Sequence, residues 1–202
     1  MKDLLALTRH ALAGLRVIIL LTVVLGLAYP LVLTGIAQVA LPWRANGSLV
    51  TASGDHTTDP GQAVGSTLVG QVSDAAGLFV GRPSVSDNDM LATGGSNLGP
   101  ESPDLVAAIE QRRAEVAARE GVAGTAVPPD ALTASASGLD PDISPAYAAL
   151  QVPRVARETG LSEAEVTRLV REHTTGRGLG VLGEARVNVL LLNLAVRGAA
   201  GP

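Results

Sequence analysis

The sequence predicts a single N-terminal transmembrane helix followed by a mixed α/β (α+β) extracytoplasmic domain. Residues 17–43 form one apolar stretch without a charge, and after it short apolar runs bounded by Gly and Ser alternate with helical patterns. The 202 residues leave room for one ordinary domain plus a short extra element. We therefore expect a short cytoplasmic N-terminus at residues 1–16, a transmembrane helix at 17–43 and a globular domain at 44–202.

The composition narrows the classes of function. The chain has no cysteine, which excludes disulfides, thiolate metal sites and cysteine nucleophiles. Residues 1–16 carry a net charge of +2 (three basic residues against one acid), whereas residues 17–202 carry −6 (12 Arg against 18 acids). Because nucleic-acid binding needs a basic surface, the acidic main domain argues against a nucleic-acid partner.

The apolar stretch predicts a membrane anchor with a defined orientation. About 20 apolar residues span a bilayer, so residues 17–43 are long enough with some tilt. Three basic residues precede the stretch, Arg44 follows it, and Trp43 occupies an interfacial position, which places the N-terminus in the cytoplasm. The alternative is a cleaved secretory signal ending near residue 37, but its apolar part would exceed the roughly 7–15 residues that are usual.

Small and polar residues recur along this helix. Every fourth position carries one of them, at Thr22, Gly26, Pro30, Thr34 and Gln38. In lipid, such a face lets helices approach closely and share hydrogen bonds, so these residues are a candidate contact face for a partner helix. Gly, Thr and Pro are also ordinary in membrane helices, which leaves the alternative of no special role. Pro30 disfavours helical geometry in the residue before it and predicts a kink there.

Three apolar segments of the domain predict strands. Residues 67–72 and 77–81 are short runs bounded by Gly and Ser. Residues 185–196 carry the β-branched Val187 and Val189 in their first half and continue as a nearly unbroken apolar run, which favours a buried strand.

Capping signals predict the helices. The Ser-Pro pairs at 102–103 and 144–145 each place a cap hydroxyl before a proline in the first helical position. Pro153 is expected to kink the second of these helices or divide it in two. Ser162 and Glu165 stand at the spacing of a capping box and predict a third helix.

Two glycine-rich motifs suggest nucleotide or anion binding. Residues 178–183, GLGVLG, fit the dinucleotide fingerprint, but a helix precedes them and a strand follows, the reverse of the required order, so we expect a connector. Residues 94–100, GGSNLGP, could form an anion-holding turn, yet the Lys followed by Ser or Thr that a nucleoside triphosphatase loop requires is missing. A tight turn before the helix at residue 102 is the simpler interpretation.

The sequence selects no catalytic or metal-binding arrangement. Only His56 and His173 lie outside the N-terminal segment, and no His, Asp or Glu pair shows metal-ligand spacing. A serine hydrolase built from Ser135, His173 and Asp140 is conceivable, but nothing in the spacing selects these three. We expect no metal site and no catalytic residue.

Many segments, in one order, resemble the KdpC family, the C subunits of the bacterial Kdp high-affinity potassium-transporting ATPase. They are TGIAQVALPWRANGSL, GSTLVGQ, GRPS, LATGGSNLGPESP, TASASGLDPDISPAYA, QVPRVARETGLS and GEARVNVLLLNLAV, and they cover nearly the whole chain. In the fifth segment Ala136 stands where the family usually has glycine and Asp142 where it usually has histidine. Any role of that histidine therefore cannot be transferred to this chain.

The resemblance implies an accessory subunit in the cell membrane, not an independent enzyme. Its partners would be a channel-like A subunit, which holds the potassium pathway, and a P-type B subunit, which hydrolyses ATP. The complex uses ATP and potassium, while no motif in this chain indicates a bound cofactor. The family's C subunit is required for assembly and has been proposed as a catalytic chaperone that raises the ATP affinity of the B subunit through the loop at residues 133–145. A domain outside the membrane cannot touch cytoplasmic ATP, so we favour assembly and shaping of the potassium entrance.

The family motifs supply the candidate subunit contacts of the domain. These are Gly81, Arg82, Pro83, Ser84, Gly95, Ser96, Asn97, Leu98, Gly99, Ser135, Ser137, Gly138, Leu139, Asp140, Pro141, Ser144 and Pro145. Two other functions stay open at this point: a membrane-anchored extracytoplasmic serine hydrolase, and a signal-processed soluble binding protein.

Overall fold

The computed structural model describes residues 2–73 and 75–201, and for residues 2–5 the backbone alone. The chain divides into an N-terminal unit, Met1–Gly47, and a C-terminal unit, Ser48–Pro202. Each unit is described by itself.

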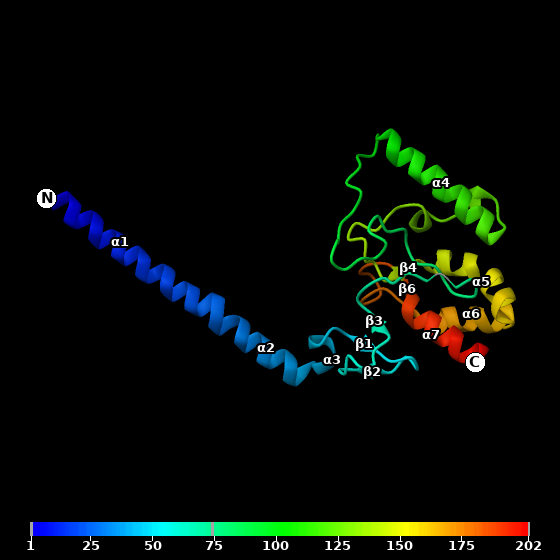
Figure 1. Ribbon diagram of the computed structural model, residues 1–202, viewed down its shortest axis with the longest axis horizontal. Helices are drawn as coiled ribbons and strands as arrows, with labels where there is room; N and C mark the ends of the chain where they lie inside the picture. Colours follow the sequence, from blue (N-terminus) through cyan, green and yellow to red (C-terminus); the bar gives the residue numbers. More distant parts are fainter. Residues whose placement is uncertain (1, 74, 202) are drawn as a thin grey trace. The chain divides into compact units, whose positions relative to one another are not determined.

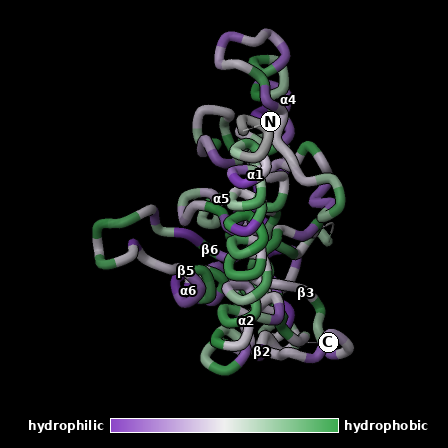
Figure 2. The backbone as a smooth tube through the Cα atoms, turned by 90° about the vertical axis from the view of Figure 1, so that its left-hand side faces the viewer, coloured by the Kyte–Doolittle hydropathy of each residue, from purple (hydrophilic) through white to green (hydrophobic). Residues whose placement is uncertain are grey.

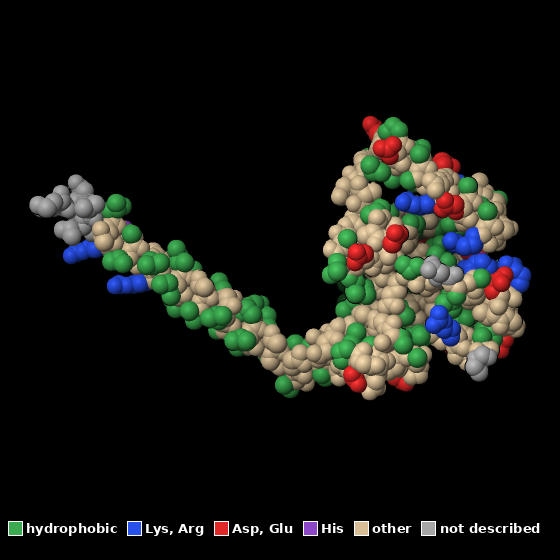
Figure 3. All heavy atoms as spheres, viewed as in Figure 1, with side chains coloured by type: hydrophobic (Ala, Val, Ile, Leu, Met, Phe, Trp, Pro, Cys, Tyr) green, Lys and Arg blue, Asp and Glu red, His purple; other side chains and the backbone are tan. Residues whose placement is uncertain are grey.

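The N-terminal unit is a long apolar helix. It consists of α1 (Lys2–Leu21), a π-helical segment (Thr22–Ala28) and α2 (Tyr29–Ala40), followed by the short helix α3 (Pro42–Ala45) (Figure 1). Residues Ala6–Ala40 are long and apolar enough to cross a membrane, with a mean hydropathy of 2.5 in their most apolar window. Hydrophobic side chains line this helix in Figure 3, and basic ones appear only near its beginning. The predicted apolar helix is therefore present, although it ends at Ala40 and Trp43 belongs to α3, and its place in a membrane stays a prediction.

The irregularity of this helix differs from the expected one. Tyr29, which precedes Pro30, is helical with φ −62° and ψ −51°, so the expectation of a kink at that residue is wrong. The deviation lies upstream, in the π-helical segment that contains Thr22 and Gly26. Pro30 has no N–H to donate to the carbonyl of Gly26, and its ring crowds that carbonyl; a wider turn before the proline relieves the clash. The contact face of five small and polar residues stays a prediction, and its last member, Gln38, accepts a hydrogen bond from Asn46 Nδ2 at 2.9 Å.

The C-terminal unit contains two small antiparallel sheets. The first has the order β2-β1-β3, from β1 (Leu49–Val50), β2 (His56–Thr57) and β3 (Gly65–Ser66). The second has the order β4-β6-β5, from β4 (Asp142–Ile143), β5 (Thr174–Thr175) and β6 (Arg186–Asn188). Both sheets are short, and much of the chain between the elements runs as irregular extended segments (Figure 1).

Four helices provide most of the core. They are α4 (Pro103–Glu120), α5 (Pro145–Thr159), α6 (Glu163–Glu172) and α7 (Val189–Ala200), with two 3₁₀ turns at Gly124–Ala126 and Pro129–Ala131. Within the main core cluster, the largest fully buried apolar side chains come from α5, α6, α7, β6 and the segment before residue 81: Phe79, Tyr147, Val155, Val166, Val187, Leu192 and Val196. A mixed helix and strand domain after one apolar helix was expected, and this part of the fold prediction is confirmed.

The local capping signals are mostly confirmed. Ser144 Oγ accepts from Tyr147 N at 3.0 Å, and Ser162 and Glu165 form the predicted capping box. Ser102 caps α4 by its backbone position only, because its side chain makes no cap hydrogen bond. Helix α5 continues through Pro153 as one helix, so the predicted division into two helices is wrong, while the alternative of a kink stays a prediction.

The three predicted strands are wrong for the most part. Residues 67–72 and 77–81 are irregular, and the nearest strand, β3, ends at Ser66. In the segment 185–196 only Arg186–Asn188 is a strand, and the remainder opens helix α7. The side chain of Asn188 accepts from Leu191 N at 3.2 Å and so starts a helix inside an apolar run whose periodicity fits either structure.

Candidate functional site

Three motif loops that are far apart in the sequence lie against one another in the C-terminal unit. We call residues 81–88, 94–95 and 133–142 the three-loop cluster. Backbone hydrogen bonds join them: Ser135 N donates to Pro83 O at 2.8 Å, and Gly94 N donates to Ser137 O at 2.9 Å. A fourth segment is attached by Gly70 N, which donates to Leu139 O at 2.7 Å. The sequence motifs therefore form one surface.

Arg82 connects two of these loops. Its Nη1 donates to Asp140 Oδ2 at 2.8 Å, and its Nη2 donates to the carbonyl of Thr133 at 3.2 Å. The ion pair is partly exposed, at 25% and 31% of the two side chains, which limits its contribution to stability to about 1 kcal/mol or less. The Nε of Arg82 is buried and has no hydrogen-bond partner among the described residues. The main role of Arg82 is therefore to position the 133–140 loop.

The hydroxyl groups of the cluster organise backbone turns. Ser84 Oγ accepts from the backbone N–H groups of Ser86 and Asn88, at 3.1 and 3.0 Å. Ser137 Oγ accepts from Leu139 N at 3.1 Å and lies 3.2 Å from Ser135 Oγ. Ser135 is buried, with 3% of its surface exposed. These serines hold the shape of the loops.

Glycines make the close approach of the loops possible. A Cβ on Gly138 would lie 2.5 Å from Ser86 Oγ and 3.0 Å from the carbonyl oxygen of Gly94. Gly138 also has a φ of +73°, which side chains rarely tolerate. A Cβ on Gly95 would lie 2.9 Å from the carbonyl oxygen of Ala136. The three-loop cluster is thus packed backbone against backbone.

Not every predicted contact residue belongs to this cluster. Ser96, Asn97, Leu98 and Gly99 are exposed beyond it, and Ser102 N donates to Gly99 O at 3.0 Å in the turn that leads into α4. This turn agrees with the simpler interpretation of GGSNLGP. Ser144 and Pro145 start α5, where Asp130 accepts from Ser144 N at 2.7 Å.

A cavity of about 580 Å³ opens beside the cluster. Arg82, Ser84 and Asp140 line its cluster side, and Leu190 and Leu194 of α7 are part of its apolar wall. Pro141 lines it as well, and its carbonyl accepts from Val189 N at 3.0 Å. This volume is within the range of small-molecule sites, and it places the cluster at the edge of a hollow.

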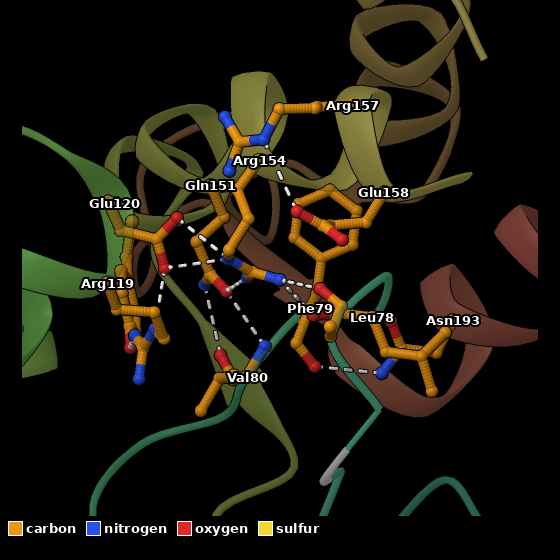
Figure 4. A network of polar contacts seen from close by, with 12 residues as sticks. Leu78, Phe79, Val80, Arg119, Glu120, Gln151, Arg154, Arg157, Glu158 and Asn193 are labelled. Atoms are coloured by element: carbon orange, nitrogen blue, oxygen red, sulfur yellow. Dashed lines mark hydrogen bonds and ion pairs between the residues drawn. The ribbon is translucent and has the colours of Figure 1, made fainter. Parts of the chain in front are cut away.

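A buried polar network holds the segment that leads into the cluster (Figure 4). The Nε of Arg154, on α5, donates to the carboxylate of Glu120, at the end of α4, at 2.9 Å. Only 7% of the Arg154 side chain and 0% of the Glu120 side chain are exposed. Arg154 also donates to the carbonyls of Ala76 and Leu78. The charges are therefore neutralised inside the protein, and the segment is attached to them.

Two amide side chains complete this attachment by imitating a strand partner. Asn193 of α7 accepts from Phe79 N at 2.7 Å and donates to Phe79 O at 2.9 Å. Gln151 of α5 accepts from Val80 N at 2.8 Å and donates to Val80 O at 3.0 Å. The backbone N–H and C=O groups of Phe79 and Val80 therefore have hydrogen-bond partners without a β-ladder, which is why the strand predicted at residues 77–81 does not form.

The geometry does not assemble the hydrolase that the sequence left open. His173 Nδ1 lies 2.9 Å from Leu169 O at the end of α6, Asp140 pairs with Arg82, and Ser135 contacts Ser137. Among the described residues no group of three or more His, Asp or Glu could hold a metal ion. Residues 178–183 form a connector as expected, but they join the two strands β5 and β6, whereas a helix was expected to precede them. What remains is a rigid loop surface beside a cavity.

Comparison with known proteins identifies the relatives of this chain. Residues 11–198 match the family model described as KdpC, the c chain of the K⁺-transporting ATPase. The potassium-transporting ATPase KdpC subunit of Kineococcus radiotolerans is 51% identical over 196 residues, which cover 96% of each chain. That of Sorangium cellulosum is 50% identical over 193 residues, covering 94% of this chain and 98% of the relative.

The chain belongs to the KdpC family. This result confirms the family that the motif series predicted. The three-loop cluster includes segments that carry the resemblance to this family.

The two departures from the usual motif have structural explanations. Ala136 is exposed and its φ is not positive, so a methyl group in place of the usual glycine hydrogen meets no obstacle from the backbone conformation. Asp142 lies in β4 and pairs with Arg186 Nε at 3.0 Å, while Asn188 Nδ2 donates to it at 3.2 Å. Burial raises the pKa of the Asp142 carboxyl, and the hydrogen bond from Asn188 and the charge of Arg186 oppose that rise.

Sequence reasoning missed the residues of the buried network. Gln151 and Arg154 lie in the family segment QVPRVARETGLS, and Asn193 interrupts the apolar run VLLLNLAV. A polar side chain within an apolar helical run was the available signal, because a buried polar group needs a partner. That signal could not identify the partners, because the two amides bind backbone groups that lie 71 and 114 residues away in the sequence.

We predict that Gly138→Ala destabilises the C-terminal unit. The added Cβ meets Ser86 Oγ and a backbone carbonyl, and the left-handed φ strains any side chain, so the free energy of unfolding should fall by about 1–3 kcal/mol. Urea unfolding of the full chain in mild detergent, followed by circular dichroism, measures this. Gly99→Ala is the matched control: nothing lies within 4 Å of its Cβ, and a change within about 0.5 kcal/mol is expected. Equal losses of unfolding free energy in both variants would contradict the close packing of the loops around Gly138.

Proposed function

We propose that this chain is the accessory C subunit of an ATP-driven potassium importer of the Kdp type. The observation that carries the proposal is the family match over residues 11–198, together with relatives of about 50% identity whose names are potassium-transporting ATPase KdpC subunits. The partners would be a channel-like A subunit and an ATP-hydrolysing B subunit. ATP and potassium would be handled by those partners, and this chain would bind no cofactor of its own.

We further propose that the apolar part of the Ala6–Ala40 helix, from residue 17 on, anchors the chain in the cell membrane as a single span, with residues 1–16 in the cytoplasm. The basic residues near its beginning favour a cytoplasmic N-terminus, which would put residues 48–202 outside the cytoplasm. Under this orientation the three-loop cluster cannot reach cytoplasmic ATP. Any effect on the nucleotide affinity of the B subunit would be transmitted through the complex, and assembly and shaping of the potassium entrance are the more direct roles.

A non-catalytic role is supported by the chemistry of the cluster. Its serines are engaged with backbone N–H groups or with each other, and its arginine is paired with Asp140. A nucleophile needs a base within hydrogen-bond reach, and the two histidines of the C-terminal unit lie in β2 and at the end of α6. We therefore assign the cluster a structural or contact role toward the partners.

Deletion of the chain tests the proposed function. In a bacterium that depends on this system for potassium, deletion should abolish growth at limiting potassium and leave growth at high potassium unchanged. A plasmid copy of the chain should restore growth. Normal growth of the deletion strain at limiting potassium would contradict the proposal.

Thiol labelling tests the orientation. The chain has no cysteine, so a substitution introduces its sole thiol. An impermeant maleimide added to intact cells should label Ser53→Cys, in the exposed turn between β1 and β2, and should label Leu7→Cys only after lysis. The reverse pattern would show that the C-terminal unit faces the cytoplasm.

A further inference from the structure

The hairpin between β5 and β6 ends in an apolar tip that is exposed to solvent. We define the tip as residues 178–183. Leu179 is 92% exposed, Val181 75% and Leu182 61%. In Figure 2 the chain beyond β5 and β6 extends away from the rest of the C-terminal unit, and its end is coloured as hydrophobic. Three large apolar side chains at the end of a projection are unfavourable in water unless another surface covers them.

The tip has a defined shape. Gly178 and Leu182 form a bridge in which each backbone N–H donates to the other's carbonyl at 2.8 Å. Leu179 has a φ of +51°, a left-handed conformation that is strained for a residue with a branched side chain, and Gly180 continues at +79°. Glycine or asparagine at position 179 would remove both the strain and the exposed side chain. The hairpin therefore presents an apolar side chain in a fixed position at a cost in stability.

A groove at the base of the hairpin extends this surface. It has a volume of about 640 Å³, is lined by α5 and α6, and includes Thr174 and Gly176 at the start of the hairpin. Ala149 and Pro153 line its α5 side. Because proline has no N–H, Pro153 cannot donate to the carbonyl of Ala149, which is its partner position one turn earlier in α5. We call the tip and this groove together the hairpin surface.

The charge and the shape argue against a lipid bilayer as the partner of this surface. Residues 48–202 contain 11 Arg against 18 acids, a net charge of −7, and an acidic domain is repelled by anionic lipid headgroups. Segments that enter the lipid interface are usually rich in basic residues, whereas the tip carries none and the groove is lined by a single one, Arg171, together with the acidic Glu163. A fluid bilayer also does not require a strained, hydrogen-bonded shape. A recess in a folded protein does.

The size of the tip argues against a second copy of this chain. Three side chains offer on the order of a few hundred Å², below the roughly 800 Å² per partner of a stable interface. Such a contact is effective where other contacts already hold the two proteins together.

We propose that the hairpin surface docks into an apolar recess on another subunit of the same ATPase. The proposal rests on the proposed function, which supplies a partner already held beside the chain. Leu179 fills the recess, Val181 and Leu182 pack at its edge, and the groove receives a neighbouring segment of the partner.

Charged substitutions in the tip test this docking. In the intact complex, purified in mild detergent through a tag on another subunit, Leu179→Asp with Leu182→Asp should lower the fraction of the chain retained after dilution by about tenfold or more. Val106→Asp is the matched control, because Val106 is 54% exposed on α4 and lies outside the hairpin surface. Equal retention of the tip variant and the control would overturn the docking proposal. Failure of the wild-type chain to co-purify at all would instead overturn the proposed function.

A photo-crosslinking residue at position 179 identifies what covers the tip. Adducts with another subunit of the ATPase are expected in the membrane-embedded complex. Adducts confined to lipid, or to a second copy of this chain, would overturn the proposal.

Leu179→Gly separates docking from folding. Glycine relieves the left-handed strain, so the midpoint of urea unfolding of the free chain should stay the same or rise. Retention in the complex should nevertheless fall, because the side chain that fills the recess is gone. A variant that is retained like the wild type would show that Leu179 makes no contact with a partner.

Discussion

The fold of the C-terminal unit depends on one buried ion pair, between Glu120 and Arg154. The Glu120 side chain has no exposed surface and that of Arg154 has 7%. Burying a charged group costs several kcal/mol unless a partner and enough hydrogen bonds replace the lost water. Arg154 meets this requirement through Glu120, Gln151 and two backbone carbonyls of the segment before Phe79. One set of hydrogen bonds therefore joins the end of α4, the middle of α5 and that segment, and both buried charges have their partners within it.

This constraint connects the core to the candidate functional surface. Arg82 follows Val80 by two residues, and Val80 is attached to Gln151 while Phe79 is attached to Asn193. The hydrogen bonds of Phe79 and Val80 to side chains of the helical core therefore set the position of Arg82. Arg82 in turn positions the 133–140 loop. By contrast, residues 96–99 and the hairpin tip are exposed. The unit thus combines an anchored loop cluster with projecting segments that are available to partners.

The parts of this structure that the sequence predicts are local ones. Ser144 and Ser162 start helices because each hydroxyl reaches a backbone N–H three residues away, a relation visible in any short stretch of sequence. The strand expected at 77–81 fails because its partners are amide side chains on α5 and α7, which only the tertiary fold brings close. Helix α7 was missed because an apolar run around Asn193 fits a buried strand or a buried helix equally well. The motif series predicted the family, but it held no information on which loops meet.

Hydrogen exchange at Phe79 and Val80 tests most directly whether the buried charge pair and its amides hold the loop cluster. In the full chain in mild detergent, both backbone amides should be protected as strongly as core helical amides, although they belong to no strand. Arg154→Met should increase their exchange by two orders of magnitude or more, on the basis of about 3–5 kcal/mol for breaking a buried pair. Arg157→Met, which breaks an exposed pair with Glu158 on the same helix, should leave it unchanged. Rapid exchange in the wild type, or equal exchange in the two variants, would contradict this account.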